Sequence, residues 1–349
     1  MVVSIIVPVL NEKENIEELV DRIDKTLKDI EYEIIFVDDG SDDGTIDIIN
    51  NLINKNKKIK LLERGSKKGL ASAFVDGLKL ASGDYIVLMD ADLQHPPELL
   101  KKMYDKIREG YDLIIASRYV EGGKIEGWSF KRKLISRIAI LLSHILLPET
   151  LKIKDVTSGY FIIRKELLND FEVSDPFSYK VLLDILVKIK PKKILEIPYT
   201  FKERKYGKSK LKGKVMISYI VQIIKLFDFW QFIKFNIVGI SGIFVNIGSL
   251  YILYQFLPFY ISSLLSIIAS IIWNFILNDF LVFKEKRKPF VQRFLLFIIG
   301  RGIISQPFQY FSALFFFYVL NLNYILSQLL AIFFAAMINW VYTKGVVYN

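Results

Sequence analysis

The sequence contains no cysteine. Disulfides and thiolate metal sites are therefore excluded, and the absence fits a reducing compartment. The first fifteen residues also lack the basic segment that opens a signal peptide, and their apolar run alternates in the manner of a β-strand. We therefore expect the N-terminal domain to stay in the cytoplasm, where it is made.

Charged residues become scarce near the C-terminus. Residues 1–212 mix charged and apolar side chains, whereas from about Trp230 onward Ile, Leu, Phe and Tyr dominate. A chain of 349 residues has room for about two domains. The contrast between its two parts predicts a soluble domain followed by a membrane domain.

The formal net charge is +10, and much of the excess is local. Residues 202–214 carry seven basic residues and one acidic residue, and residues 284–288 carry four and one. Basic runs beside apolar segments favour anionic lipid headgroups or phosphate ligands over nucleic acid. A solvated charged face is the alternative for either run.

Strand-like and helix-like segments alternate through the soluble part. Strand-like runs at 2–10, 59–64, 84–92 and 111–119, and at 32–41 where a turn follows the strand, are separated by segments with helical spacing. This rhythm with short connections predicts a parallel α/β sheet, with ligands bound at the carboxyl ends of the strands.

Two carboxylates follow one of these strands. Asp90 and Asp92 are two positions apart, so in extended backbone they point to the same side. Adjacent carboxylates repel one another unless a cation lies between them. Oxygen ligands select Mg²⁺ or Mn²⁺, and Gln94 offers a third oxygen. We therefore expect a divalent cation that neutralises a diphosphate leaving group.

Cations stand where a second anionic substrate would need them. Arg118 follows a strand, Arg132 lies in a basic segment, and Arg204 and Lys208 lie in the run 202–214. Guanidinium groups suit bidentate phosphate contacts, and lysine acts as a point charge. A phosphate acceptor is largely dianionic at neutral pH, so it needs no general base. We therefore assign no catalytic base.

Three ordered motifs, VVSIIVPVLNEKENI, EIIFVDDGSDDGT and YIVLMDADLQHPPE, resemble glycosyltransferase family 2 on the GT-A fold, which is Rossmann-like. The resemblance extends from residue 2 to about residue 211. It implies that the first two motifs hold the nucleotide and that the third holds the metal and the diphosphate. The implied donor residues are Pro8, Val9, Asn11, Glu12, Val37, Asp39, Asp90, Ala91 and Asp92.

Further stretches, notably DLIIASRY, DVTSGYFIIRKELL and FKERKYGKSKL, resemble the polyprenyl-phosphate (dolichyl-phosphate) mannose synthases. That resemblance implies inverting transfer of mannose from GDP-mannose to a polyprenyl phosphate. It places Arg118, Arg132, Arg204 and Lys208 around the phosphates, with Ser136 assisting at the acceptor. Asp155 and Ser158–Gly159 would line the floor of the acceptor side. The implied catalytic residues are Asp92, Arg118, Arg132 and Arg204.

Two amphipathic segments adjoin the soluble domain. Residues 130–147 carry one apolar helical face with basic residues at the start, which indicates an interfacial helix or else a core-packing helix. Residues 213–230 are apolar around most of the circumference and carry a polar stripe at 214, 218, 222 and 225. This second segment also suits the membrane interface.

The remaining residues, 231–349, predict an all-α domain of four transmembrane helices, each long enough to cross the bilayer. The expected spans are 232–256, 260–283, 293–319 and 324–347. By the positive-inside rule, we expect the basic loop 284–289 to lie in the cytoplasm. Because the number of spans is even, both termini are then expected there too. NFILNDFLVF and NWVYTKGVVY echo one another 65 positions apart, a duplication that resembles the GtrA-like membrane family.

Two ionisable residues lie inside these spans. Asp279 and Arg301 either pair with each other, line a path for a lipid headgroup, or extend to the interface.

Other functions stay open at this point. One alternative is a polyprenyl-phosphate glucosyltransferase that uses UDP-glucose. Another is a flippase or scaffold for lipid-linked sugars, in which the soluble domain would only bind. A processive polysaccharide synthase normally carries Q-x-x-R-W, and this sequence has no Arg-Trp dipeptide. The soluble domain retains Asp39, Asp90, Asp92 and Arg118, which argues for an active enzyme.

Overall fold

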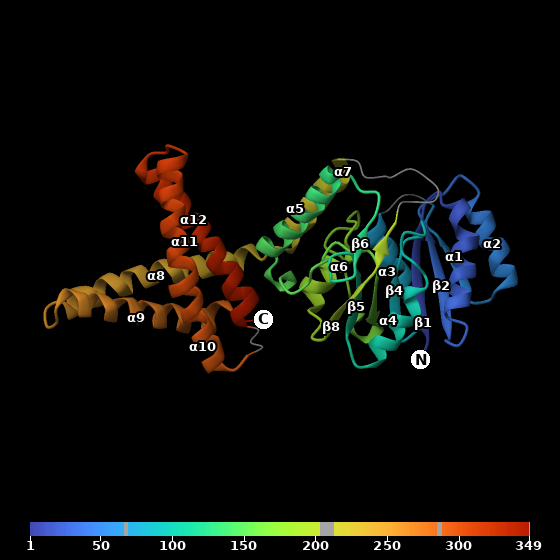
Figure 1. The fold of residues 1–349 in the computed structure, drawn as a ribbon. Helices are drawn as coiled ribbons and strands as arrows, with labels where there is room; N and C mark the ends of the chain where they lie inside the picture. The colour runs from blue at the N-terminus through green and yellow to red at the C-terminus, as the bar shows by residue number, and fades with distance from the viewer. Residues whose placement is uncertain (66–68, 203–212, 285–287, 349) are drawn as a thin grey trace. The chain divides into compact units, whose positions relative to one another are not determined.

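The computed structural model describes residues 1–65, 69–202, 213–284 and 288–348. The chain divides into two compact units, shown in Figure 1. The N-terminal unit comprises Met1–Ser143 and Lys152–Leu226, and the C-terminal unit comprises His144–Leu151 and Phe227–Asn349. The expected domain boundaries, 1–212, 213–230 and 231–349, stay a proposal beside this division.

A seven-stranded sheet in the order β3-β2-β1-β4-β7-β5-β8 forms the centre of the N-terminal unit. Its strands are β1 (Val3–Val9), β2 (Tyr32–Asp38), β3 (Ile59–Glu63), β4 (Tyr85–Leu88), β5 (Leu113–Ser117), β7 (Phe161–Arg164) and β8 (Ile194–Pro198). The side chains of β2 and β4 are buried throughout, as expected for strands covered by helices on both faces. The predicted α/β fold class is confirmed.

The expectation of an all-parallel sheet is wrong at one strand. β7 runs antiparallel to both of its neighbours, β4 and β5. Arg118 directly follows β5, and its backbone N–H donates to Asp155, a residue shortly before β7, at 3.0 Å. The end of β5 and the start of β7 therefore lie at the same edge of the sheet. β7 therefore enters the sheet from the edge at which β5 leaves it.

Helices cover the sheet because each presents apolar side chains at helical spacing. In α1, for example, Ile16, Leu19 and Ile23 are fully buried against the sheet. The helices of this unit are α1 (Lys13–Thr26), α2 (Thr45–Lys55), α3 (Leu70–Leu80), α4 (Leu99–Arg108), α5 (Phe130–Leu146, to Ser143 in this unit), α6 (Val181–Asp184) and α7 (Gly213–Leu226). Two short strands, β6 (Lys124–Ile125) and β9 (Thr200–Phe201), pair in parallel beside the main sheet.

The polar stripe of α7 packs inward. Gln222 is fully buried, and its Nε2 donates to the carbonyl of Lys180 at 2.9 Å and to a carboxylate oxygen of Asp184 at 2.6 Å. Ser218 donates to the carbonyl of Phe177 at 3.2 Å. Ile223 and Leu226 are buried too, whereas five apolar side chains of α7 are exposed, namely Met216, Ile217, Ile220, Val221 and Ile224.

An apolar stripe on α5 is exposed as well. Leu134, Ile138 and Leu141 recur at helical spacing and are 46%, 54% and 57% exposed. Ser143 is the buried residue of the helix, and its hydroxyl lies 2.5 Å from that of Tyr219 on α7. An exposed stripe of this size is unusual for a core-packing helix. The interfacial interpretation of 130–147 stays a prediction.

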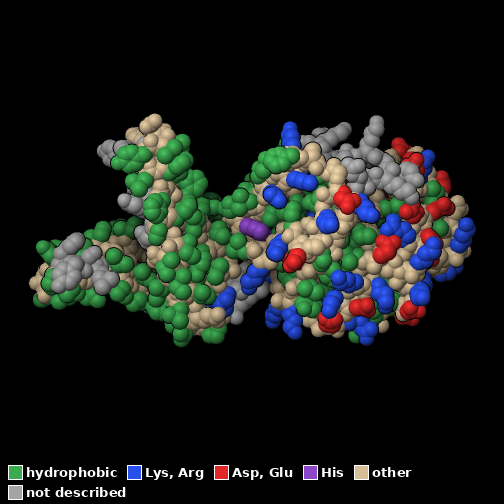
Figure 2. All heavy atoms as spheres, viewed as in Figure 1, with side chains coloured by type: hydrophobic (Ala, Val, Ile, Leu, Met, Phe, Trp, Pro, Cys, Tyr) green, Lys and Arg blue, Asp and Glu red, His purple; other side chains and the backbone are tan. Residues whose placement is uncertain are grey.

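The C-terminal unit is helical and mostly apolar on its surface (Figure 2). Its α-helices are α8 (Phe229–Leu253), α9 (Phe259–Leu277), α10 (Phe290–Ile299), α11 (Gln306–Leu314) and α12 (Tyr324–Tyr342). π-Helical turns follow four of them: η4 (Asn278–Val282), η5 (Gly300–Ser305), η6 (Phe315–Val319) and η7 (Thr343–Tyr348).

Three helical segments among the described residues are long and apolar enough to cross a membrane, namely Phe229–Leu253, Leu265–Val282 and Leu330–Tyr348. They overlap the first, second and fourth expected spans. The third expected span, 293–319, coincides with the consecutive segments α10, η5, α11 and η6. The count of four spans therefore stays a prediction.

The expected pairing of Asp279 with Arg301 is wrong. Asp279 is buried and accepts two hydrogen bonds from Arg293, at 2.8 and 3.1 Å. Arg293 lies near the start of α10, whereas Arg301 lies in the following segment, η5. It is the guanidinium of Arg293 that lies within hydrogen-bonding distance of Asp279. Arg301 makes no ion pair among the described residues, and the other two alternatives for it stay open.

Candidate active site

A cavity of about 300 Å³ lies at the carboxyl ends of β1, β4 and β5, entirely within the N-terminal unit. This is the edge at which parallel α/β sheets bind their ligands. Eleven of the expected site residues line the cavity: Pro8, Val9, Glu12, Asp39, Asp90, Ala91, Asp92, Gln94, Arg118, Arg132 and Gly159.

The two carboxylates of the D-x-D motif lie in a tight turn after β4. Asp92 is 3% exposed, and its Oδ1 accepts from the backbone N–H of Gln94 at 3.1 Å. The turn requires Leu93 to adopt a left-handed backbone with φ of 60°, which is uncommon for a residue with a branched side chain. Strained backbone of this kind clusters at ligand sites.

His95 holds the backbone of this turn. Its Nδ1 accepts from the N–H of Asp90 at 2.9 Å, and its ring stacks on Tyr160 with the ring centroids 5.0 Å apart. Burial lowers the pKa of His95 to about 4, against the attraction of Asp92, so the ring is neutral at physiological pH. The sequence analysis missed His95 because its contact with the N–H of Asp90 depends on the shape of the D-x-D turn.

Asp39, at the end of β2, is held by a buried arginine. Its carboxylate pairs with Arg64, and its Oδ2 accepts from the N–H of Gly69 at 3.2 Å. Gly69 has φ of +96°, and a Cβ there would lie 2.5 Å from the carbonyl oxygen of Pro176, so no larger residue fits. Arg64 also binds Ser72 at 2.8 Å, which fixes the guanidinium.

Two expected donor residues do not line the cavity. The side-chain amide of Asn11 exchanges hydrogen bonds with Asp42, at 2.8 and 3.0 Å, and so ties the ends of β1 and β2 together. Val37 is fully buried in the sheet. Both residues support the wall of the site from outside the cavity.

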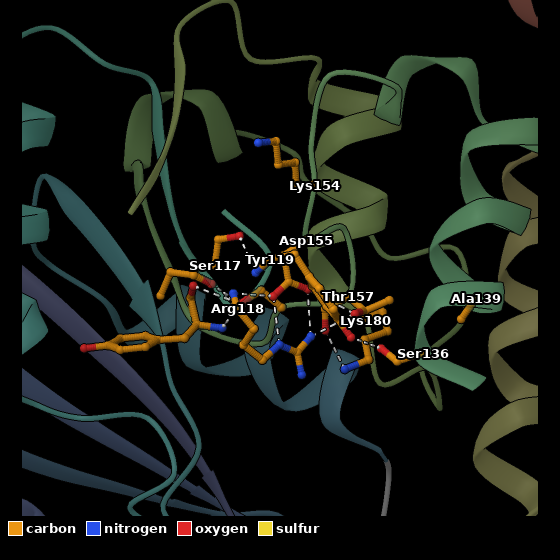
Figure 3. Close-up of polar contacts among 12 residues, drawn as sticks. Ser117, Arg118, Tyr119, Ser136, Ala139, Lys154, Asp155, Thr157 and Lys180 are labelled. Carbon is orange, nitrogen blue, oxygen red and sulfur yellow. Dashed lines mark hydrogen bonds and ion pairs between the residues drawn. The ribbon is translucent and has the colours of Figure 1, made fainter. Parts of the chain in front are cut away.

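Arg118 is held rigidly at the floor of the site (Figure 3). Its guanidinium makes two hydrogen bonds to the buried Asp155, at 2.8 and 2.7 Å, and a third to Thr157 at 2.9 Å. Burial opposes the charge, but Asp155 outweighs it and raises the pKa of Arg118. The same pairing keeps the pKa of Asp155 low despite burial.

The expected floor of the acceptor side is thus only partly correct. Gly159 lines the cavity, but Asp155 and Ser158 do not. Asp155 lies beneath and orients Arg118, while Ser158 donates to the carbonyl of Ala116 at 2.7 Å.

Lys180 is a further cation of the site. It lines the cavity and donates to the carbonyl of Thr157 at 2.7 Å (Figure 3). Burial, followed by repulsion from Arg118, lowers its pKa to about 8. The sequence analysis missed Lys180 because the surrounding segment 178–184, SYKVLLD, looks like the start of an ordinary amphipathic helix.

Arg132 and Ser136 both lie on α5. The guanidinium of Arg132 lies 4.2 Å from the centre of the Trp128 ring, which fixes the side chain by a cation–π contact at the cavity. Ser136 does not line the cavity; its hydroxyl accepts from that of Tyr119 at 2.8 Å.

Arg204 and Lys208 lie outside the described residues. Their expected roles therefore stay predictions from the sequence.

The D-x-D turn offers the right donors for a hard divalent cation. Asp90 and Asp92 supply carboxylate oxygens, and Nε2 of Gln94 donates to the carbonyl of Lys202 at 2.7 Å, which holds the Gln94 amide in place. Within the described residues no group of three His, Asp or Glu side chains can hold a metal. Such a donor set fits an ion whose remaining positions are filled by substrate oxygens and water.

Two known families match the chain. Residues 4–171 match glycosyl transferase family 2, and residues 234–348 match the GtrA/DPMS transmembrane domain. The chain is 48% identical over 255 residues to the dolichol-phosphate mannosyltransferase of Pyrococcus furiosus, covering 72% of each chain. It is 35% identical to the Saccharomyces cerevisiae protein of that name, covering 65% of this chain and 87% of the relative.

A solved structure shares the fold of the N-terminal unit. Glucosyl-3-phosphoglycerate synthase from Mycobacterium tuberculosis, in complex with Mn²⁺, UDP and its product, aligns with a TM-score of 0.50 at 21% identity. The alignment covers 64% of this chain and 78% of that one. The matched families and the GT-A-like fold together show that the chain is a membrane-bound glycosyltransferase belonging to the dolichol-phosphate mannosyltransferase family.

Proposed function

We propose that the enzyme transfers mannose from GDP-mannose to a polyprenyl (dolichyl) phosphate at the cytoplasmic face of the membrane. The transfer inverts the configuration at the anomeric carbon. One observation carries this proposal: a single cavity brings the carboxylates of Asp90 and Asp92 together with the cations Arg118, Arg132 and Lys180. The relatives named above support mannose and dolichyl phosphate as the substrates.

The donor lies on the side of the cavity formed by β1, β2 and β4. Asp39, which pairs with Arg64, accepts N–H groups of the nucleobase, and guanine offers two adjacent ones. Asp90, Asp92 and Gln94 would hold Mg²⁺ or Mn²⁺ near the diphosphate. A bound divalent cation supplies charge neutralisation to the leaving diphosphate.

The acceptor phosphate lies on the opposite side, among the cations. Arg118 and Arg132 are both fixed by other contacts, so they can receive a phosphate without losing much side-chain freedom. An acceptor oxygen attacks the anomeric carbon from the face opposite the diphosphate, and the bond from that carbon to the diphosphate oxygen breaks. We retain Ser136, Arg204 and Lys208 as phosphate contacts on the sequence argument.

The membrane brings the acceptor to this cavity. The exposed apolar faces of α5 and α7 suit the bilayer interface, where a polyprenyl phosphate presents its headgroup. The basic loop 284–289 favours a cytoplasmic position for the loop and for both termini.

A substrate panel tests the proposal. The purified full chain is incubated with polyprenyl phosphate, Mn²⁺ or Mg²⁺, and labelled GDP-mannose, UDP-glucose or UDP-mannose. We expect a mannosyl-phosphate lipid from GDP-mannose alone, and its anomeric configuration is read by NMR. Preferred use of UDP-glucose would assign the glucosyltransferase alternative. Translocation of a lipid-linked sugar without transfer from any donor would assign a transporter.

A further inference from the structure

A buried glutamine on the inner side of α7 contacts the segment that carries one cation of the candidate active site. Nε2 of Gln222 faces two acceptors, the carbonyl of Lys180 at 2.9 Å and a carboxylate oxygen of Asp184 at 2.6 Å. Because both partners accept hydrogen bonds, the amide nitrogen and not the amide oxygen faces them. Burying an amide costs free energy that an apolar side chain would not cost. Gln222 therefore contributes through the two groups to which it donates.

These contacts fix the backbone at Lys180 from a separate helix. The carbonyl of Lys180 also accepts from the N–H of Leu183 at 3.0 Å, a hydrogen bond within α6 itself. Because α6 has only four residues, this local hydrogen bond holds Lys180 at the end of a single turn. Gln222 ties that turn to α7 at both ends, and the second carboxylate oxygen of Asp184 accepts from the N–H of Ser174 at 2.6 Å. The position of Lys180 thus depends on α7.

Hydrogen bonds lead on from Lys180 to the floor of the site (Figure 3). Nζ of Lys180 donates to the carbonyl of Thr157 at 2.7 Å, and the hydroxyl of Thr157 accepts from the guanidinium of Arg118 at 2.9 Å. Lys180 and Arg118 both line the cavity. A shift of the backbone at Lys180 would therefore move one cation of the cavity and remove a contact of Thr157, which binds the other cation.

We propose that Gln222 is a positioning residue that holds Lys180 in place for the phosphate of the acceptor. This inference rests on the acceptor proposed above. Gln222 does not line the cavity, so it acts on the phosphate only through Lys180. The opposite side of α7 presents exposed apolar residues that suit the bilayer interface. The same helix would thus join the membrane surface to a cation of the site.

A double-mutant cycle on the full chain tests the proposal. Isothermal titration calorimetry in detergent measures the Kd of farnesyl phosphate for the native chain, Gln222→Met, Lys180→Met and the double variant. We expect Gln222→Met to weaken binding roughly fivefold, as for loss of one hydrogen bond, and Lys180→Met to weaken it roughly tenfold or more. The double variant should bind as weakly as Lys180→Met, because Gln222 acts through Lys180.

Ser218→Ala is the matched control, because the hydroxyl of Ser218 also donates from α7 to a backbone carbonyl, that of Phe177, at 3.2 Å. Its effect on the Kd should be small, and equal with and without Lys180→Met. If the effects of Gln222→Met and Lys180→Met multiply in the double variant, Gln222 acts by packing alone and the proposal is wrong. Unchanged binding by Gln222→Met would also overturn it.

If Gln222→Met does not fold, Gln222→Glu combined with Asp184→Asn takes its place in the cycle. This pair keeps a hydrogen bond between positions 222 and 184 but leaves no donor for the carbonyl of Lys180. It should melt near the native chain and bind farnesyl phosphate roughly fivefold more weakly; native-like binding contradicts the proposal. A native chain that does not bind farnesyl phosphate overturns the proposed acceptor and this inference with it, whereas binding with multiplying effects overturns only the role of Gln222.

Discussion

Asp92 is nearly buried at the bottom of the D-x-D turn, with one carboxylate oxygen already bonded to the backbone of Gln94. We expect Asp92→Ala to reduce transfer by roughly a hundredfold or more, because Asp92 is one of the residues that would hold the proposed divalent cation. Transfer is measured over a Mn²⁺ titration, with unfolding monitored by circular dichroism. Asp105→Asn, on the exposed side of α4, is the control. Near-normal transfer by Asp92→Ala without added chelator would remove this residue from the metal site.

The lowered pKa of Lys180 predicts an alkaline limit for the enzyme. Its pKa of about 8 means that it carries a proton below pH 8 and loses it above, so attraction for substrate phosphate falls as pH rises. We expect kcat/KM to decline above pH 8 in the native enzyme, and this decline to be absent in Lys180→Met. Profiles from pH 6.5 to 9.5 provide the measurement, with the exposed Lys102→Met as control. An identical alkaline decline in Lys180→Met would assign the limit to another group.

At the scale of elements, the carboxylate of Glu33 joins β1 and β2 to the loop before β4. It accepts from the Ser4 hydroxyl at 2.6 Å, from the N–H of Ser82 at 2.6 Å, and pairs with Lys60 at 2.6 Å. Burial opposes ionisation, but these partners outweigh it and lower the pKa of Glu33 to about 2. The resulting stabilisation is complete above pH 4.5 and is lost as pH falls toward 2.

Glu33→Gln should therefore lower the melting temperature at pH 7, and its difference from the native chain should shrink at pH 3. The shift corresponds to at most about 3 kcal/mol. Melting of the N-terminal unit is followed in detergent at both pH values, with the exposed Glu31→Gln as control. A melting difference that does not change with pH would show that Glu33 acts by packing alone.

The apolar stripe of α5 gives a second prediction at this scale. Replacing Leu134, Ile138 and Leu141 together by serine should raise the KM for a long polyprenyl phosphate in bilayers. A short acceptor in detergent should be used normally, because the cavity is unchanged. Leu80→Ser, on the exposed end of α3, is the control. Equal effects on long and short acceptors would place the defect in the cavity.

For the whole molecule, every described residue that lines the cavity precedes residue 227. A chain that ends at Leu226 should therefore retain most transfer to a short acceptor dispersed in detergent. It keeps His144–Leu151 but lacks Lys344, the ion-pair partner of Glu149, and the assay is run in detergent. Kinetics with farnesyl phosphate and GDP-mannose measure the activity. A folded truncated chain without any transfer would give the C-terminal unit a role in binding the acceptor.

Local patterns were sufficient for much of this protein. Period-two and period-3.6 spacing predicted β1 to β5 and most helices of the N-terminal unit, because side-chain direction follows from backbone geometry within a few residues. The later strands β7 and β8 and the short helix α6 were not predicted. The two aspartates of the D-x-D motif are neighbours in sequence, so their shared position needed no fold. The same holds for the apolar spans, whose length and composition are properties of continuous segments.

Contacts between distant segments were decided by the tertiary structure. Arg118 and Asp155 are 37 positions apart, and only the antiparallel course of β7 explains their pairing. Asp279 pairs with Arg293 rather than Arg301 because packing places that guanidinium within reach. The sequence by itself determined the fold class, the carboxylate pair and the apolar segments, since these depend on local order. Which groups pair with each buried charge depends on their distance and burial in the fold. Because these groups lie far apart in the sequence, only the tertiary structure decided the pairing.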